Sequence, residues 1–265
     1  MKKNILFFTF LKANDSNVSN YVEWALNTWK HYAKRHNCEI FILEEALHDT
    51  EWMRPTWQRW YVYDLLKANN IAYNQVALID VDTMVKWDAP DIFELSENNY
   101  SGVRDDVSVG WNCNSIDGYK RFFPEVNLEW DNYINNGVLV LPTWDGEEFC
   151  EKVKTFYLEN VDTLRDLQHH SLKKGTDQTP VNYLALQHFG ENRIKYLSKK
   201  LNMTHLETTF SFTPSWNPGD EVFKPTGIPS FIKHGYIWHF NALPREKRSY
   251  LMEQTWNLIK SNYTE

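Results

Sequence analysis

Apolar runs of strand length alternate with amphipathic segments along the first 80 residues of the chain. Three runs contain almost no polar side chain, which is typical of strands buried on both faces; they are residues 5–11, 39–43 and 76–79. Between them, residues 18–36 repeat apolar side chains at steps of three and four, and residues 57–68 follow Pro55, which favours a helix start. Buried strands that alternate with helices predict an α/β, Rossmann-like fold with a mostly parallel central sheet flanked by helices.

The second half of the chain is more mixed, but the same signals recur. Further strands are expected at 133–141, 208–213 and 236–240, and further helices at 149–157, 178–188 and 245–261. Thr176 or Asp177 is placed to cap the second of these helices. Residues 214–230 contain four prolines, and we expect a long ordered loop over a site. No repeat or linker interrupts the pattern, so one domain is expected over residues 1–265.

Charge and cysteine content limit the partners and the compartment. With 28 Lys and Arg against 35 Asp and Glu, the net charge of −7 argues against an extended nucleic-acid surface. Cys38, Cys113 and Cys150 are too scattered for a disulfide framework, and reduced thiols indicate a cytoplasmic protein. The N-terminal apolar run is short and lacks a small-residue cleavage site, so a buried strand is favoured over a signal peptide. No segment reaches the ~20 apolar residues of a membrane span, so the sequon at Asn202 carries little weight.

Two aspartates, Asp80 and Asp82, directly follow the apolar strand at 76–79. In open α/β sheets, ligands bind beyond the carboxyl ends of the strands. Carboxylates two residues apart at that position can hold one hard divalent ion, Mn²⁺ or Mg²⁺, which would neutralise a diphosphate. For an isolated pair, the alternative is a solvated turn.

Other polar residues occur in an order that supports a binding site. Arg59 lies in the helix before this strand, and Asn135 opens a later apolar run. Asp177 and Gln178 stand at an expected helix start. His239 ends a strand near the C-terminus, and its neutral imidazole suits such an ion as a third ligand. A lone histidine on an apolar strand is more often a core residue, so the ordered set carries the interpretation.

Four segments resemble motifs of the retaining glycosyltransferases of the GT-A fold, especially the glycogenin-like family 8. "ALIDVDTMVKWDAPDIFEL" (77–95) resembles the Asp-x-Asp strand and its following turn, and "YINNGVLVLP" (133–142) the Asn-x-Gly strand. "TDQTPVNYL" (176–184) resembles the Asp-Gln segment, and "IWHFNALPREK" (237–247) the C-terminal His segment. The resemblance runs over most of residues 4–248.

This resemblance implies the fold and the reaction. It implies a GT-A fold with a donor-binding part at about 1–142 and a sugar- and acceptor-binding part at about 143–265. The implied reaction moves a sugar from a nucleotide-diphosphate sugar, such as a UDP-sugar, to an acceptor hydroxyl with retention of configuration. The acceptor class stays open between glycan, lipid, protein and modified base.

On the donor side, the resemblance assigns a role to each matching residue. Three residues would bind the metal: Asp80, Asp82 and His239. Asp80 would also contact the donor ribose, and Arg59 would face the donor. Thr9 and Phe10, at the end of the first strand, would border the nucleobase.

On the sugar side, the resemblance implies that Asn135 and Asp177 hydrogen-bond the transferred sugar and that Gln178 lies near the anomeric carbon. Retention leaves two routes open: Asp177 as a nucleophile, or same-face attack without a covalent intermediate.

The C-terminal segment departs from the family pattern. Ala242 replaces the family's glycine, and residues 244–247 replace its Lys-Pro-Trp ending. The cation that holds the diphosphate is therefore open between Lys247, Arg245 and Lys233.

Three other classes compete with this interpretation. A haloacid-dehalogenase-type phosphatase also begins with an apolar strand and Asp-x-Asp, but it has a threonine where this chain has Met84. A noncatalytic carbohydrate-binding protein would account for the 15% aromatic content without needing the acidic motif. A nucleotidyltransferase would carry a glycine-rich basic loop, whereas residues 12–20 contain no glycine.

Three smaller features are given their simplest interpretation. His169 and His170 are expected at a solvated helix end. Asp105 and Asp106 are expected in a charged surface turn, with the acceptor side as the alternative. Trp216, in the proline-rich loop, is expected to stack on a sugar or base.

Overall fold

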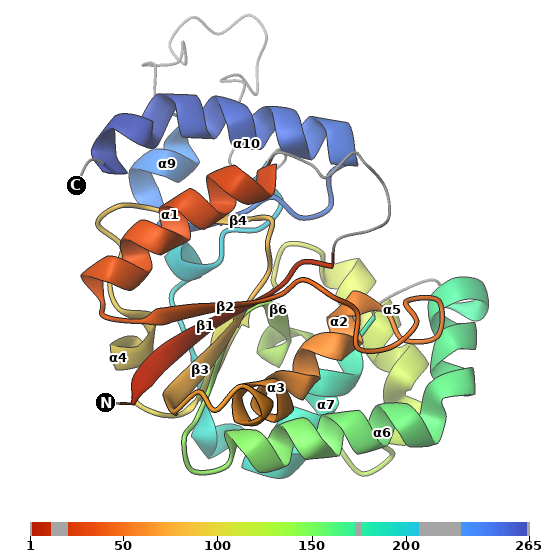
Figure 1. Cartoon of the computed structure of the whole chain (residues 1–265). Coiled ribbons are helices and arrows are strands. Elements are labelled where there is room, and N and C mark those ends of the chain that lie inside the picture. Colours follow the sequence, from red (N-terminus) through yellow and green to blue (C-terminus); the bar gives the residue numbers. More distant parts are fainter. Residues whose placement is uncertain (1, 12–20, 173–175, 207–228, 264–265) are drawn as a thin grey trace, which may run out of the picture.

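The computed structural model describes residues 2–11, 21–172, 176–206 and 229–263, and its centre is a six-stranded sheet (Figure 1). The strands are β1 (Lys3–Thr9), β2 (Glu39–Leu43), β3 (Tyr73–Ile79), β5 (Tyr100–Arg104), β6 (Ile134–Leu141) and β7 (Ile194–Tyr196). Their order is β2-β1-β3-β6-β5-β7, and β6 alone runs opposite to the rest of this sheet. The predicted mostly parallel sheet is confirmed.

Side chains along the central strands alternate between two buried faces. In β1, Ile5 and Phe7 pack into the core on one side of the sheet, while Leu6 and Phe8 pack into the core on the other. β3 alternates in the same way. Because burying each such side chain contributes roughly 1.5–3 kcal/mol, both faces favour apolar residues, and the strand reads as a continuous apolar run.

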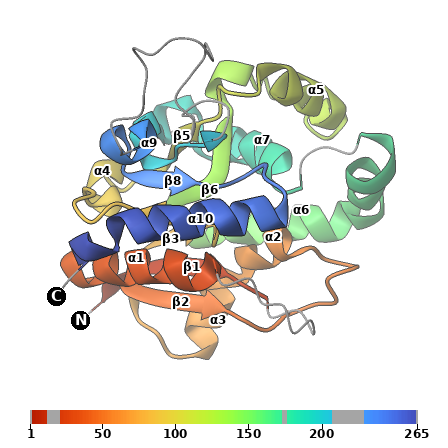
Figure 2. The same cartoon turned by 90° about the horizontal axis from the view of Figure 1, so that it is seen from above.

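Helices cover both faces of the sheet (Figures 1 and 2). One face carries α1 (Tyr21–Arg35) and α4 (Ile92–Ser96), and α9 (Ser230–His234) and α10 (Arg245–Ile259) lie beyond α1 in a further core on the same side. The other carries α2 (Pro55–Gln58), α3 (Val62–Ala68), α5 (Val109–Tyr119), α6 (Gly146–Asp166) and α7 (Gln178–Phe189). Within the described residues, no helix combines the length and apolar character needed to cross a bilayer.

Most of the expected elements are present with shifted ends. β6, β8 (Ile237–His239), α7 and α10 occupy the segments predicted at 133–141, 236–240, 178–188 and 245–261, and α6 extends well beyond 149–157. The prediction of a side-chain cap for α7 is wrong, because Asp177 occupies the capping position but makes no capping hydrogen bond. The expected strand at 208–213, most of the loop at 214–230 and Trp216 lie outside the described residues.

The predicted continuous helix at 57–68 is wrong in one respect. It consists of α2, a 3₁₀ turn at Arg59–Tyr61, and α3. The tighter turn carries Arg59 and Trp60, and both side chains donate hydrogen bonds to Asp177. The helix is therefore interrupted at the residues whose side chains bind Asp177.

Candidate functional site

A short antiparallel pair of strands brings together the separated parts of the predicted metal site. β4 (Thr83–Val85) begins directly after Asp82 and pairs with β8, so that Thr83 lies opposite His239. The Phe240 amide donates to the Asp82 carbonyl at 2.9 Å, and Thr83 Oγ1 donates to the Asp80 carbonyl at 2.6 Å. These bonds fix the turn after β3 against the end of β8.

Asp80, Asp82 and His239 converge in this arrangement. His239 Nε2 lies 3.2 Å from Asp82 Oδ1 and 3.6 Å from Asp80 Oδ2. One ligand atom from each residue lies within 4.8 Å of the other two. The side chain of His239 is 4% exposed and that of Asp80 is 38% exposed, so the centre opens to solvent on the Asp80 side. Two carboxylates and one imidazole suit a hard divalent ion such as Mn²⁺ or Mg²⁺.

The imidazole and the nearer carboxylate of this centre form a buried ion pair. Burial by itself would raise the pKa of Asp82, but the attraction of His239 and Arg248 outweighs it, and the pKa falls below its ordinary value. Burial would likewise lower the pKa of His239, but the attraction of Asp82 and Asp80 raises it. The proton on His239 thus supplies the positive charge next to the aspartates that a bound cation would otherwise supply.

Arg59 links this centre to Asp177. Its Nη1 donates to Asp80 Oδ1 at 2.9 Å and to the Asn136 carbonyl at 3.1 Å. Its Nε and Nη2 donate to Asp177 Oδ2 at 3.0 and 2.5 Å, and Trp60 Nε1 donates to the same oxygen at 3.0 Å. The Asp177 side chain is 2% exposed. Asp177 therefore lies in a buried ion pair, and its predicted contact with a sugar stays a prediction.

The reversed direction of β6 places the other predicted sugar-binding residue beside the metal centre. Because β6 is antiparallel to β3, its first residues lie at the carboxyl end of β3, where the Asp80 amide donates to the Gly137 carbonyl at 2.9 Å. Asn135 and Gln178 line a cavity of about 300 Å³ there. The remaining lining residues are Asp105, Ser108, Trp111, His205, Asn241 and Ala242.

Asp105 is a cavity residue, so the expectation of a surface turn is wrong for it. It is 5% exposed, and its Oδ2 accepts from Asn135 Nδ2 at 3.1 Å and from Gln178 Nε2 at 3.4 Å. Asp106 is exposed and pairs with Lys199, as expected for a surface turn. Asp105 directly follows β5, just as Asp80 follows β3. In the sequence, Asp105 could have been found as an acidic residue directly after a strand. However, β5 contains Ser101 and Gly102 and is not an apolar run, so the sequence does not predict this strand.

One buried polar atom of a cavity-lining residue, Asp105 Oδ1, has no hydrogen-bond partner among the described residues. The same holds for Asn112 Oδ1 and both amide atoms of Asn136, in residues that do not line the cavity. A buried polar group without a partner costs roughly 1–3 kcal/mol. Asp105 Oδ1 is therefore a candidate to accept a hydrogen bond from a ligand hydroxyl.

Thr9 lies at a second, smaller hollow on the other side of Asp80. This pocket has a volume of about 60 Å³ and is also lined by Arg59 and Phe7. Thr9 Oγ1 is buried and has no partner within the described part of the chain. Phe10 packs against the core under α10, and the role of both residues at a base stays a prediction.

Arg248, in the first turn of α10, contacts the metal centre. Its Nη1 lies 3.3 Å from Asp82 Oδ2, and its Nε donates to the Phe240 carbonyl at 3.0 Å. Sequence reasoning considered Lys233, Arg245 and Lys247, which are all exposed, and missed Arg248. A signal was available, because helical residues three apart share a face and Arg248 follows Arg245 at that spacing.

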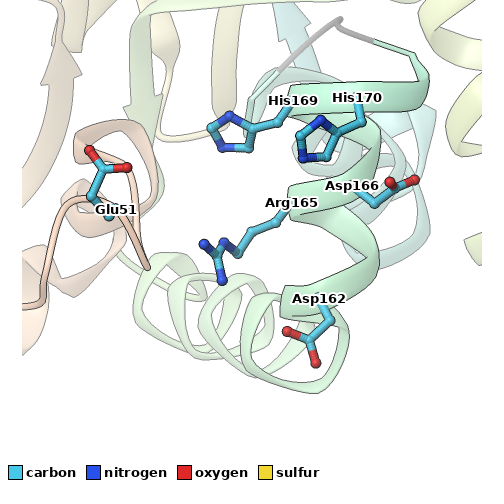
Figure 3. Close-up of a pocket in the computed structure, with 6 residues that line it drawn as sticks. All are labelled: Glu51, Asp162, Arg165, Asp166, His169 and His170. Carbon is cyan, nitrogen blue, oxygen red and sulfur yellow. The ribbon is translucent and has the colours of Figure 1, made fainter.

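A further pocket, of about 310 Å³, lies at the end of α6 (Figure 3). Glu51 faces Arg165 and His169 across it, and Asp162, Asp166 and His170 complete its lining. All six lining residues are exposed, and their charges have both signs. The expected solvated helix end at His169 and His170 is confirmed, and nothing in this hollow resembles the buried polar arrangement at Asp80.

Comparison with known proteins defines the fold. No family model and no curated protein matches the chain. The chain is similar to a glycosyltransferase involved in the glycosylation of the major capsid of PBCV-1, with a TM-score of 0.53 and 12% identity over 95% of this chain and 99% of the other. At this identity the match establishes the shared fold, and the predicted GT-A-like α/β fold is confirmed.

Two further solved structures are similar at lower TM-scores. Mouse xyloside xylosyltransferase 1, in its apo form, gives a TM-score of 0.44 at 13% identity over 91% of this chain and 98% of the other. The apo form of the glycosyltransferase GlyE of Streptococcus pneumoniae TIGR4 gives 0.47 at 14% identity over 99% of this chain and 63% of the other.

Proposed function

We propose that this chain is a metal-dependent glycosyltransferase of the glycogenin-like family 8. It would transfer a sugar from a nucleotide-diphosphate sugar, most simply a UDP-sugar, to an acceptor hydroxyl with retention of configuration. The observation that carries the proposal is the convergence of Asp80, Asp82 and His239 at the carboxyl edge of the sheet, next to a cavity of about 300 Å³ lined by Asp105, Asn135 and Gln178. The similarity in fold to the glycosyltransferase involved in the glycosylation of the PBCV-1 major capsid supports this class.

Asp80, Asp82 and His239 would hold Mn²⁺ or Mg²⁺. When bound, the ion would supply Lewis-acid stabilisation of the negative charge that develops on the leaving diphosphate. The two aspartates present their oxygens from a turn fixed at both ends by backbone bonds, so little reorganisation accompanies ligand binding. Asp80 is the most exposed of the three and would face the donor.

Asn135, Gln178 and Asp105 would bind the transferred sugar. Cleavage of the sugar–diphosphate bond develops positive charge on the sugar ring, and nearby carboxylate and amide oxygens stabilise it. Asp105 Oδ1 is buried and has no partner among the described residues, so it would accept a hydrogen bond from a sugar hydroxyl. Asp177 Oδ2 already accepts three hydrogen bonds, two of them from a guanidinium, which lowers its nucleophilicity. We therefore favour same-face attack by the acceptor over a covalent intermediate on Asp177.

Two of the three competing classes, the phosphatase and the carbohydrate-binding protein, account for less of the site. In the phosphatase interpretation, the threonine position is occupied by Met84, which is fully buried in the core under α10. A noncatalytic carbohydrate-binding protein accounts for Trp111 in the cavity lining but leaves the convergent aspartates and histidine without a role.

The experiment that tests the proposal measures nucleoside diphosphate release from a panel of nucleotide sugars. Release is expected from one donor with Mn²⁺, and its loss is expected with a chelator and in Asp82→Ala. Asp106→Ala is the matched control, because Asp106 is an exposed aspartate that pairs with Lys199 outside the site. This control is expected to behave as the wild type.

Donor hydrolysis without an acceptor is slow in some transferases, so binding is measured in parallel. Calorimetry with Mn²⁺ and then with each nucleoside diphosphate gives the second readout. If the wild type releases no nucleotide and binds neither Mn²⁺ nor nucleotide, the proposal fails. In that case, metal-independent glycan binding would identify a carbohydrate-binding protein.

A further inference from the structure

Asn202 is a buried residue on which the metal centre depends, although it belongs to none of the family-like motifs. It is 1% exposed, so it is not accessible for glycosylation despite its sequon. The backbone holds it beside β8, because the Met203 amide donates to the Ile237 carbonyl at 2.9 Å and the His239 amide donates to the Met203 carbonyl at 2.9 Å. Its side chain lies 3.0 Å from His239, between Asn202 Oδ1 and His239 Nδ1.

The hydrogen bonds beyond Asn202 fix the direction of this contact. The Gly137 amide can only donate, and it donates to Asn135 Oδ1 at 2.9 Å. Asn135 Nδ2 donates in turn to Asp105 Oδ2 at 3.1 Å. Asn202 Nδ2 therefore donates to Asn135 Oδ1, at 2.9 Å, and Asn202 Oδ1 is left facing the histidine. An amide oxygen only accepts, so His239 Nδ1 carries the proton.

This order leaves the lone pair of the neutral imidazole on Nε2. Nε2 is the atom that faces both aspartates, at 3.2 Å from Asp82 and 3.6 Å from Asp80. Metal-binding histidines depend on such a partner at the other ring nitrogen, which sets the tautomer and the ring orientation. From these contacts we infer that Asn202 is a positioning residue of the metal centre, which holds His239 as the Nδ1–H tautomer with Nε2 free for the divalent ion. The inference rests on the metal dependence in the proposed function.

Gly137 supports the same arrangement from the other side of the ring. A Cβ at position 137 would lie 2.5 Å from His239 Nδ1 and 3.0 Å from Asn135 Oδ1. The ring is thus held between the backbone of Gly137 and the amide of Asn202. The imidazole has no room to turn without breaking its bond to Asn202.

Two substitutions of Asn202 separate positioning from mere packing. Asn202→Leu has nearly the same shape but cannot accept the Nδ1 proton. Asn202→Asp keeps the acceptor and loses the donor to Asn135. If Asn202 positions His239, Asn202→Leu weakens binding of Mn²⁺ alone by about 10–100-fold, and Asn202→Asp restores it to the wild-type level or above. If Asn202 only packs, Asn202→Asp is the worse variant, because it buries an additional charge.

Calorimetric titration with Mn²⁺ and long-range ¹H–¹⁵N correlation of His239 in the metal-free protein at alkaline pH are the two readouts. The wild type and Asn202→Asp are expected to show the Nδ1–H tautomer, and Asn202→Leu a loss of that preference. Gln75→Met is the control, because it removes another buried amide, bonded to Ser96 near the opposite end of β3. It is expected to leave Mn²⁺ affinity unchanged.

The inference is overturned if Asn202→Leu keeps wild-type Mn²⁺ affinity, or if both variants bind weakly with an unchanged tautomer. If Asn202→Leu does not fold, the wild type still tests the inference. Either an Nε2–H tautomer of His239 or the absence of Mn²⁺ binding in the wild type would overturn it. Neither readout uses a nucleotide sugar. A wild type that binds Mn²⁺ through His239 but transfers no sugar would refute the proposed function and leave this inference standing.

Discussion

Arg59 holds its charge between two carboxylates in a site that is almost closed to solvent. Its side chain is 6% exposed, and attraction to Asp177 and Asp80 raises its pKa although burial alone would lower it. Arg59→Met would leave Asp177 charged and unpaired in the interior. Removing one partner of a buried ion pair costs about 3–5 kcal/mol, and urea denaturation is expected to give a loss of this size. Lys3→Met, which breaks an exposed pair with Glu39, is the control and should cost far less. A loss for Arg59→Met no larger than that of the control would contradict the buried-pair description.

Gly137 permits the close approach of His239 to β6. Gly137→Ala is expected to displace the imidazole, because the added methyl group overlaps the ring and also lies close to the side chain of Asn135. Mn²⁺ affinity should fall at least tenfold while the far-ultraviolet circular dichroism stays unchanged. Gly110→Ala is the matched control, because no atom of the described residues lies within 4 Å of the added carbon and the residue lies in α5. Alanine favours a helix, so this control should keep its Mn²⁺ affinity and gain slightly in stability. Equal Mn²⁺ affinity in both variants would show that residue 137 does not restrict the ring.

At the scale of elements, α10 presents Arg245, Lys247 and Arg248 from its first turn. Arg248 is the member that contacts Asp82, and it is partly exposed, so we expect it to bind the diphosphate. One charge-assisted hydrogen bond is worth about 1.5–3 kcal/mol, which is about 10–100-fold in affinity. Arg248→Gln should weaken nucleoside diphosphate binding by that factor in the presence of Mn²⁺, but it should not weaken the binding of Mn²⁺ alone, because it removes a positive charge beside Asp82. Calorimetry on Arg245→Gln, Lys247→Gln and Lys233→Gln completes the comparison. A large loss in one of these, with none in Arg248→Gln, would assign the diphosphate to that residue instead.

The strands buried on both faces could be predicted from the sequence, because burial imposes a local pattern on every residue of β1 and β3. The direction of β6 could not, since an apolar run reads the same both ways. The direction of β6 determines which residues lie near Asp80, because it places Asn135 and Gly137 at the carboxyl end of β3. β5 and β7 were also missed, because each is short and its pairing depends on its neighbours. The order of Asp80, Asp82 and His239 in the chain indicated that they could share a site, and the structure brings them together; their binding of a metal stays a prediction. Three features could not be predicted, because they depend on partners more than 25 residues away in the chain. They are the ion pair of Asp177, the burial of Asp105 and the contact of Asn202 with His239.

At the scale of the whole molecule, the candidate metal centre joins the central sheet to the segment packed in the core under α10. Asp80 and Asp82 follow a strand of the central sheet, whereas His239 and Arg248 belong to the segment packed with α10. In the metal-free protein this junction is held partly by the ion pair between His239 and Asp82. A divalent ion would replace the proton of His239 and hold the same junction. Protonation and metal binding therefore stabilise the same fold in opposite pH ranges.

The pH dependence of stability follows from this competition. The pKa of His239 is higher in the folded protein than in the unfolded chain, where it is about 6.5. The contribution of His239 to the stability of the fold is therefore complete below about pH 6.5 and is lost as pH rises through the folded pKa. The folded pKa of Asp82 is lowered, so its contribution is present above about 3.9 and is lost as pH falls through the folded pKa. The metal-free protein should thus lose stability as pH rises through the folded pKa of His239. Mn²⁺ needs the neutral imidazole, so its stabilising effect should grow over the same range.

At Mn²⁺ one hundred times above its Kd, the gain is ~2.7 kcal/mol. This gain corresponds to roughly 5–11 °C in Tm for a chain of this size. Thermal unfolding with Mn²⁺ and with chelator, across this pH range, measures the difference. In His239→Gln, the difference in Tm between Mn²⁺ and chelator should no longer increase with pH, because the side chain that exchanges a proton for the ion is absent. A constant difference in the wild type would mean that His239 does not bind the ion.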